Sequence, residues 1–262
     1  MKGRLFFEIS VNIDNRWYNK RKEEKVGSQM AAITIKDAVE MIQQAKHITF
    51  LTGAGVSTAS GIPDYRSLKG VYHGLDQPEY LLSHTCMLRE PEKFYEFVQK
   101  LYHPDAKPNV IHEKIAAMEK KKDCWVVSQN IDGLHEKAGS QHCVNFHGNI
   151  YDCYCRKCHQ KVDYQDYMQS DVHRDCGGQI RPGIVLYEEG FTQDVLDSAV
   201  NAVRNADLIV IVGTTFQVHP FCDLIHYKRA DAKVLVINQT DIYLPIQAFM
   251  LQKDAVEVFE KL

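Results

Sequence analysis

Two glycines follow directly on a short apolar run, in the segment Gly53-Ala54-Gly55-Val56-Ser57. Glycines after a strand let the backbone approach a pyrophosphate, and amides at a helix N-terminus would hold its charge. The third glycine of the dinucleotide fingerprint and its distant acidic partner are missing, so an ordinary strand-to-helix turn is the alternative. The next segment, Ser60–Ser67, brings a proline, a carboxylate, an aromatic ring and a guanidinium to the same place. The pattern indicates a binding site for a phosphate-containing ligand.

Amide, carboxylate and imidazole side chains follow other apolar segments. Asn130 and Asp132 come one residue apart after a strand-like run, so both can face one crevice, where they suit a carboxamide and a sugar hydroxyl. His147 follows Phe146, and an imidazole with an unperturbed pKa near ~6.5 can take a proton from a hydroxyl at neutral pH. Turn capping by Asn130 and Asp132, and a purely structural histidine, are the alternatives.

Three cysteines and one histidine have the spacing of paired zinc knuckles. Two residues separate Cys155 from Cys158 and His173 from Cys176, and 14 residues lie between the pairs. Such pairs are typical of a closed tetrahedral Zn²⁺ site with a structural role. Cys153 is an alternative fourth ligand in place of His173, and a site without metal is the third possibility. Loss of bound zinc should unfold the module that carries these residues.

Elements that can position these side chains are visible as four short apolar runs, each ending in polar residues or glycine: Ile48–Leu51, Trp125–Val127, Leu208–Val212 and Val234–Ile237. Such runs are typical of parallel strands buried on both faces. Gln193–Asn205 is long enough for a crossover helix, and Thr34 with Asp37 predicts the capped start of a helix of about 12 residues. The pattern predicts an α/β fold with a doubly wound, Rossmann-like parallel sheet, which binds ligands at the carboxyl ends of its strands.

Three segments fall outside this alternation. Residues 1–30 are highly charged and predict a poorly ordered N-terminal tail. Residues from about 67 to 120 are helical in character, and residues 151–181 hold the cysteine cluster. Both are expected as insertions into one catalytic domain spanning 31–262. Its Rossmann-like part then comprises residues of about 31–66, 121–150 and 182–262.

Charge and hydropathy exclude several classes of protein. Lys and Arg number 31 against 34 Asp and Glu, a net charge of -3, so direct binding of nucleic acid is not expected. No apolar run approaches the roughly 20 residues of a membrane-spanning helix. Glu8 interrupts the apolar start after Phe7, which argues against a signal peptide. The close spacing of three cysteines is typical of metal binding in a reducing compartment, and a cytoplasmic protein is therefore expected. The sequence leaves the oligomeric state open.

Three segments, Gly53–Ser67, Ser128–His135 and Phe146–Gly148, together resemble the sirtuins of bacterial type, which are NAD-dependent protein lysine deacylases. The resemblance runs from about Ile33 to the C-terminus. It implies NAD as a consumed co-substrate and Zn²⁺ as a structural ion. The NAD contacts that it implies are Gly53, Ala54, Gly55, Thr58, Asp64, Tyr65, Arg66, Gln129, Asn130, Ile131, Asp132, Gly213, Thr214, Thr215, Asn238 and Ala255.

The resemblance also implies a reaction and a partner, an acyl-lysine protein or peptide. The acyl-lysine amide oxygen would attack the anomeric carbon of NAD as nicotinamide leaves. His147 would then act as general base on a ribose hydroxyl, with Asn130 as the second catalytic residue, to give O-acyl-ADP-ribose and lysine. Asp64 and Arg66 would hold the loop and phosphates, and Gln129 the ribose. Protein mono-ADP-ribosylation and a non-catalytic, NAD-sensing zinc-ribbon protein are the alternatives.

The segment Arg181–Glu189 matches the sirtuin substrate loop least well. Val185 and Tyr187 keep an apolar wall for the acyl-lysine, whereas Glu188 stands where glycine is usual and Gly183 where aspartate is usual. The extra charge of Glu188 would favour basic peptides or weaken peptide binding. Residues 96–99 lack the tyrosine and arginine of family members that remove dicarboxylic acyl groups, so a neutral acyl group, most simply acetyl, is expected.

Overall fold

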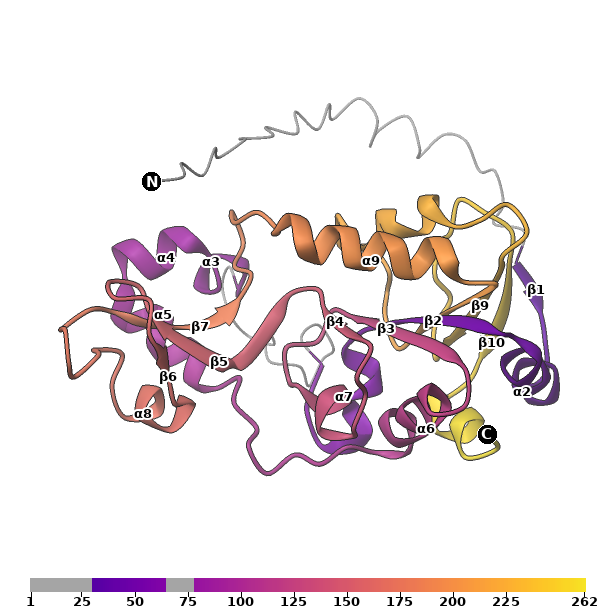
Figure 1. Cartoon of the computed structure of the whole chain (residues 1–262), viewed down its shortest axis with the longest axis horizontal. Coiled ribbons are helices and arrows are strands. Elements are labelled where there is room, and N and C mark those ends of the chain that lie inside the picture. Colours follow the sequence, from indigo (N-terminus) through magenta and orange to yellow (C-terminus); the bar gives the residue numbers. More distant parts are fainter. Residues whose placement is uncertain (1–29, 65–77) are drawn as a thin grey trace.

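The computed structural model describes residues 30–64 and 78–262 (Figure 1). The expected tail up to residue 29 lies outside the described residues, and so do Tyr65 and Arg66. Within the described parts no helix is both long and apolar enough to cross a bilayer.

The larger sheet has seven strands, and every neighbouring pair is parallel. In spatial order these are β1 (Met30–Ala32), β10 (Ala248–Gln252), β9 (Lys233–Asn238), β8 (Leu208–Val212), β2 (His47–Thr52), β3 (Asp123–Ser128) and β4 (Cys143–Asn145). All five residues of β8 at its centre are buried. The four predicted strands correspond to β2, β3, β8 and β9, which confirms the doubly wound α/β fold.

Helices cover both faces of this sheet (Figure 1). On one face, α2 (Ile35–Gln44), α6 (Val110–Glu119) and α10 (Ala255–Phe259) share a core with the strands. On the other face lie α9 (Gln193–Asn205) and the 3₁₀ helix η3 (Phe221–Tyr227). The predicted capping box is confirmed: Thr34 N–H donates to Asp37 Oδ2 at 2.9 Å, and Asp37 N–H donates to Thr34 Oγ1 at 3.2 Å. The reciprocal pair satisfies two backbone donors that the first turn of α2 leaves open.

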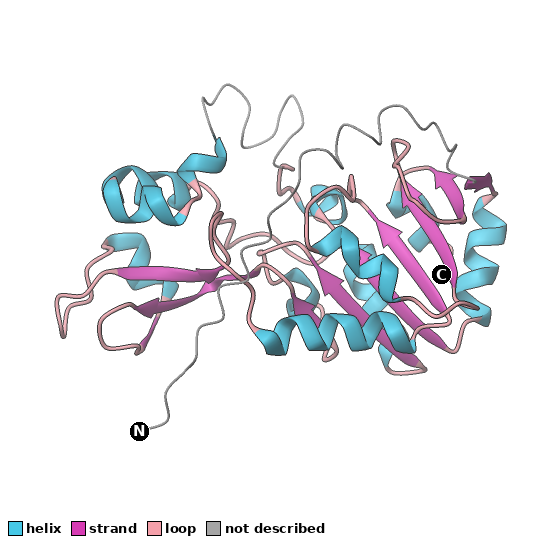
Figure 2. Cartoon of the chain, turned by 90° about the horizontal axis from the view of Figure 1, so that it is seen from above, coloured by secondary structure: helices cyan, strands magenta, loops and turns pink. Residues whose placement is uncertain are grey.

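A second, smaller body lies at the opposite end of the molecule (Figure 2). Its antiparallel sheet consists of β5 (Gly148–Cys155), β6 (Lys161–Val162) and β7 (Ile180–Ile184). One core joins this sheet to α8 (Tyr164–Gln169), α3 (Pro78–Leu81), α4 (His84–Arg89) and α5 (Pro91–Gln99). The helical segment and the cysteine module, separate in the sequence, are therefore packed together.

Candidate functional site

A cavity of about 710 Å³ lies at the carboxyl ends of β2, β3, β8 and β9. On the side opposite the strand ends, the cavity is lined by Leu82 of the smaller body and by the segment that follows β7. Of the residues expected to bind NAD or substrate, those lining the cavity are Ala54, Gly55, Thr58, Asp64, Gln129, Asn130, Ile131, His147, Val185, Tyr187, Glu188, Gly213, Thr214, Thr215, Asn238 and Ala255. A site assembled from four strand ends is the arrangement expected of a doubly wound sheet.

Two glycine loops meet at the floor of this cavity. Gly55 N–H donates to the Gly213 carbonyl at 2.8 Å, and a Cβ on Gly55 would lie 2.8 Å from Gly213 Cα. Gly53 does not line the cavity; a Cβ there would lie 2.6 Å from Thr214 Cβ. Two 3₁₀ turns, η1 (Ala54–Val56), which includes Gly55, and η2 (Thr58–Ser60), form the helical segment after Gly53. The glycines thus serve the close approach of two backbone segments as well as ligand access.

Asn130 is buried and tied to the glycine loop. Its Nδ2 donates to the Gly53 carbonyl at 3.1 Å and to Ser57 Oγ at 3.0 Å. Asp132 does not line the cavity: its Oδ2 accepts from Ser57 Oγ at 2.7 Å, and its Oδ1 from Leu134 N–H at 2.9 Å at the start of α7 (Leu134–Lys137). The expectation that both side chains face the crevice is therefore met by Asn130 alone, and Asp132 holds the serine that holds Asn130.

His147 presents one ring nitrogen for proton transfer. Its Nδ1 lies 3.1 Å from the Gln129 carbonyl, and a carbonyl only accepts, so Nδ1 carries the proton and Nε2 is left as the acceptor. Burial lowers the pKa of His147 below the usual histidine value, and the bond to Gln129 opposes this only in part. The ring packs edge-on against Phe191, with centroids 5.6 Å apart. At neutral pH the imidazole is accordingly uncharged and able to take a proton.

The segment Arg181–Glu189, the expected substrate loop, is held between the two bodies by backbone hydrogen bonds. Val185 N–H donates to the His147 carbonyl at 2.9 Å, which joins the loop to the segment bearing the imidazole. Tyr187 N–H donates to the Leu82 carbonyl at 3.1 Å, and the Tyr187 carbonyl accepts from His84 N–H at 3.0 Å. The helical segment therefore supports the loop directly, a contact that sequence reasoning did not foresee.

Glu188 turns its carboxylate toward α4. Its Oε2 accepts from Thr85 N–H at 2.9 Å and from Thr85 Oγ1 at 2.6 Å. These two bonds lower the pKa of Glu188, so it is ionised at neutral pH. Its φ of 74° lies in the left-handed region, which explains why glycine suits this position. The Glu188 carboxylate, expected at the edge where the peptide passes, is thus hydrogen-bonded to the first turn of α4.

Glu189 is a structural residue of the site that the sequence analysis missed. Arg181, only 5% exposed, bonds to both of its carboxylate oxygens and donates from Nη2 to the Ile184 carbonyl. Leu186 N–H donates to Glu189 Oε2 at 3.0 Å. Desolvation is the largest single effect and would raise the pKa of Glu189, but the hydrogen bonds from Arg181 and Leu186 N–H and the charge of Arg181 together lower it. Nothing in the spacing of two charged residues eight apart signals this buried pair.

Lys253 and Asp254 also line the cavity and were not anticipated. Asp254 is the N-cap of α10, where its Oδ1 accepts from Val256 N–H at 2.8 Å. An aspartate before a short apolar run is a recognisable cap signal, which would have located the start of α10 but not its place beside the cavity.

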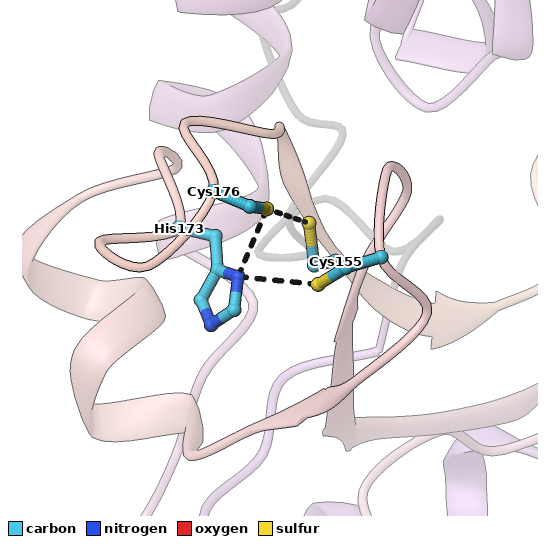
Figure 3. A group of neighbouring side chains, drawn as sticks. Cys155, His173 and Cys176 are labelled. Atoms are coloured by element: carbon cyan, nitrogen blue, oxygen red, sulfur yellow. Dashed lines mark hydrogen bonds between the residues drawn. The ribbon is translucent and has the colours of Figure 1, made fainter.

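The four predicted metal ligands lie together in the smaller body. Figure 3 shows Cys155, His173 and Cys176 pointing toward one another. His173 Nδ1 lies 3.3 Å from Cys176 Sγ and 3.4 Å from Cys158 Sγ, and all four ligand atoms are within 4.8 Å of one another. Desolvation would raise the pKa of Cys155, but amides of the Cys155–Cys158 turn lower it to about 6, which favours the thiolate that binds metal. The donor set fits a closed, structural Zn²⁺ site.

Cys153 stands outside this cluster. Its thiol lies 3.3 Å from Tyr102 Oη within the core of the smaller body. Burial raises the pKa of Cys153 to about 11, which disfavours the thiolate. Among the candidate fourth ligands, the fold places His173 and not Cys153 with the other three.

Comparisons with known proteins agree with this site. The model of the Sir2 family matches residues 53–220. NAD-dependent protein deacetylases of Enterococcus faecalis and Listeria monocytogenes are 60% and 55% identical, over 89% and 85% of this chain and 98% of each relative. A solved structure titled "Sir2-p53 peptide-NAD+" superposes with a TM-score of 0.78 at 31% identity, covering 87% of this chain and 97% of that one. On both sequence and structure, this chain belongs to the Sir2 family.

Proposed function

We propose that this protein is an NAD-dependent protein lysine deacetylase that consumes NAD and releases nicotinamide, O-acetyl-ADP-ribose and free lysine. The observation that carries the proposal is the position of His147. Its Nε2 is the proton acceptor in a cavity shared with Asn130 and the two glycine loops, and its carbonyl is bonded to the substrate loop at Val185. The general base, the glycine loops that would bind the dinucleotide and the substrate loop therefore border the same cavity.

The residues of the cavity fit NAD. The loops at Gly55 and Gly213 bring bare backbone to the surface where a pyrophosphate would pass, with Thr214 and Thr215 beside them. Asn238, at the end of β9, and Ala255, at the start of α10, line the part of the cavity where the adenosine of NAD would lie. Bound NAD supplies the electrophilic anomeric carbon and the ribose hydroxyls.

The chain's own residues then have defined tasks. Asn130, fixed by Gly53 and Ser57, orients the nicotinamide-ribose end of the ligand. Gln129 Oε1 accepts from Thr214 Oγ1 at 2.7 Å, so a hydrogen bond joins the loops after β3 and β8 where the ribose would lie. His147 Nε2 takes the proton of a ribose hydroxyl, and the neutral state favoured by burial is the state that can do so.

The acyl-lysine substrate would enter along the segment after β7. Val185, Tyr187 and Phe191 line this part of the cavity and provide the apolar contacts that an acyl-lysine chain needs. The peptide backbone would add to exposed edges of the loop by main-chain hydrogen bonds. The thiolate-rich cluster of the smaller body supports a reducing compartment, and we place the enzyme in the cytoplasm.

The test is a mass-spectrometric assay of the purified protein with NAD and an acetyl-lysine peptide, run beside His147→Ala. Deacetylated peptide together with O-acetyl-ADP-ribose, both lost in the variant, would support the proposal. ADP-ribose attached to protein while the peptide stays acetylated would overturn it in favour of ADP-ribosyl transfer. Absence of any product with several neutral acyl groups would favour a non-catalytic NAD-binding protein.

A further inference from the structure

A second group of metal-binding side chains lies at the rim of the cavity. His219 Nδ1 is 3.4 Å from Cys222 Sγ and 2.7 Å from Asp223 Oδ2. Over the described ranges, two groups of at least three His, Cys, Asp or Glu side chains bring their ligand atoms within 4.8 Å of one another; one is the Cys₃His cluster, and this is the other. The reaction proposed above uses none of its three side chains.

The spacing of this group matches that of a metal site. Its nitrogen–sulfur distance of 3.4 Å equals the His173–Cys158 distance in the Cys₃His cluster. Tetrahedral zinc, with Zn–N of about 2.0 Å and Zn–S of about 2.3 Å, separates nitrogen from sulfur by about 3.5 Å. The oxygen of Asp223 would have to move away from the imidazole by about half an ångström, which a half-exposed carboxylate can do by rotation.

The three ligands are held by one rigid turn. Cys222 N–H donates to the Val218 carbonyl at 3.0 Å, and Asp223 N–H donates to the Pro220 carbonyl at 3.1 Å. η3 is anchored in the core that it shares with α9 and the larger sheet, through its buried residues Phe221, Leu224 and Ile225. Little backbone entropy is therefore lost when an ion binds, because the positions of the three Cβ atoms are already set.

We propose that His219, Cys222 and Asp223 bind Zn²⁺ through one nitrogen, one sulfur and one oxygen, with the fourth position open to solvent. A thiolate and an imidazole select zinc over Mg²⁺ or Ca²⁺, and a neutral imidazole with two anions balances a divalent charge. On binding, the Cys222 thiol passes its proton to solvent. Because His219 also lines the cavity, the ion would narrow the cavity at this point and inhibit the enzyme; this consequence rests on the proposed function.

Zinc stoichiometry of the full chain tests the site without any assay of activity. After equilibrium dialysis against excess Zn²⁺ and elemental analysis, the wild type should hold two equivalents and Cys222→Ser one. His226→Ala, on the exposed side of the same 3₁₀ helix, is the matched control and should hold two. One equivalent in the wild type, or two in Cys222→Ser, would overturn the proposal. Asp223→Asn, with an expected tenfold or greater weakening of the second equivalent, serves if Cys222→Ser fails to fold.

Co²⁺ offers a spectroscopic check, since a thiolate–Co²⁺ charge-transfer band should accompany the second equivalent in the wild type and be missing in Cys222→Ser. Zn²⁺ should also inhibit deacetylation by the wild type at concentrations at least tenfold below those needed for Cys222→Ser. Two equivalents of bound zinc in a protein that deacetylates no peptide would support the metal site and refute the proposed deacetylase activity. Deacetylation by a protein that holds one equivalent of zinc would support the activity and refute the second metal site.

Discussion

Replacing Gly55 by alanine tests whether the two glycine loops must interlock. The new Cβ would lie 2.8 Å from Gly213 Cα and 2.9 Å from the Gly213 carbonyl oxygen, both backbone atoms that no side-chain rotation can move. The two loops would have to separate by about 0.6 Å to reach the ordinary contact of 3.4 Å. Overpacking of this kind costs about 1–3 kcal/mol. For a domain of this size, each kcal/mol lowers Tm by about 2–4 °C.

The functional effect should exceed the loss of stability. A misplacement of about 1 Å can cost on the order of 10²-fold in rate, so this smaller displacement should weaken NAD use, as kcat/KM for NAD, by about 10-fold or more. Thermal unfolding and NAD titration of Gly55→Ala measure the two effects. Gly190→Ala is the control, because a Cβ there has no neighbour within 4 Å and should change neither. A Gly55→Ala protein with wild-type Tm and wild-type kcat/KM for NAD would refute the reasoning.

Three further perturbations probe the base, the substrate loop and the metal. His147→Ala should lower kcat by about 10²–10⁴-fold with little change in Tm. In the wild type, because burial lowers the His147 pKa, kcat/KM should fall with acid only below the usual histidine range, and a limb near pH 7 or above would contradict the base assignment. Glu188→Gln and Thr85→Val should each raise the peptide KM several-fold while leaving NAD KM unchanged, since the first removes the charge of the anchor on α4 and the second removes one of its two hydrogen bonds; an unchanged peptide KM in both would show that the anchor does not position the loop. Cys155→Ser, made in the Cys222→Ser background so that only the Cys₃His cluster can hold zinc, should leave the protein without zinc by elemental analysis and destabilise the smaller body; one tightly bound zinc in this double variant would contradict the ligand assignment.

Much of the sheet could be predicted because its signals are local. The capping box joins Thr34 and Asp37, three positions apart, and the bounds of α9 match the predicted crossover segment Gln193–Asn205. A buried parallel strand needs apolar residues at every position, so β8 is readable from five residues alone. Most of the motif residues at strand ends line one cavity, with Gly53 and Asp132 as exceptions, because parallel strands of a doubly wound sheet end at the same edge.

The sequence by itself therefore determined the α/β class, the strand ends that line the cavity and three of the four clustered metal ligands, because periodicity and short spacings act between near neighbours. Tertiary structure alone decided how distant residues meet. It aimed Glu188 at Thr85, 103 residues earlier, and placed Gly55 against the Gly213 backbone. It also set His173 rather than Cys153 in the metal cluster. These contacts depend on the path of the chain between the partners and on which side chains the core buries, and no local pattern encodes either.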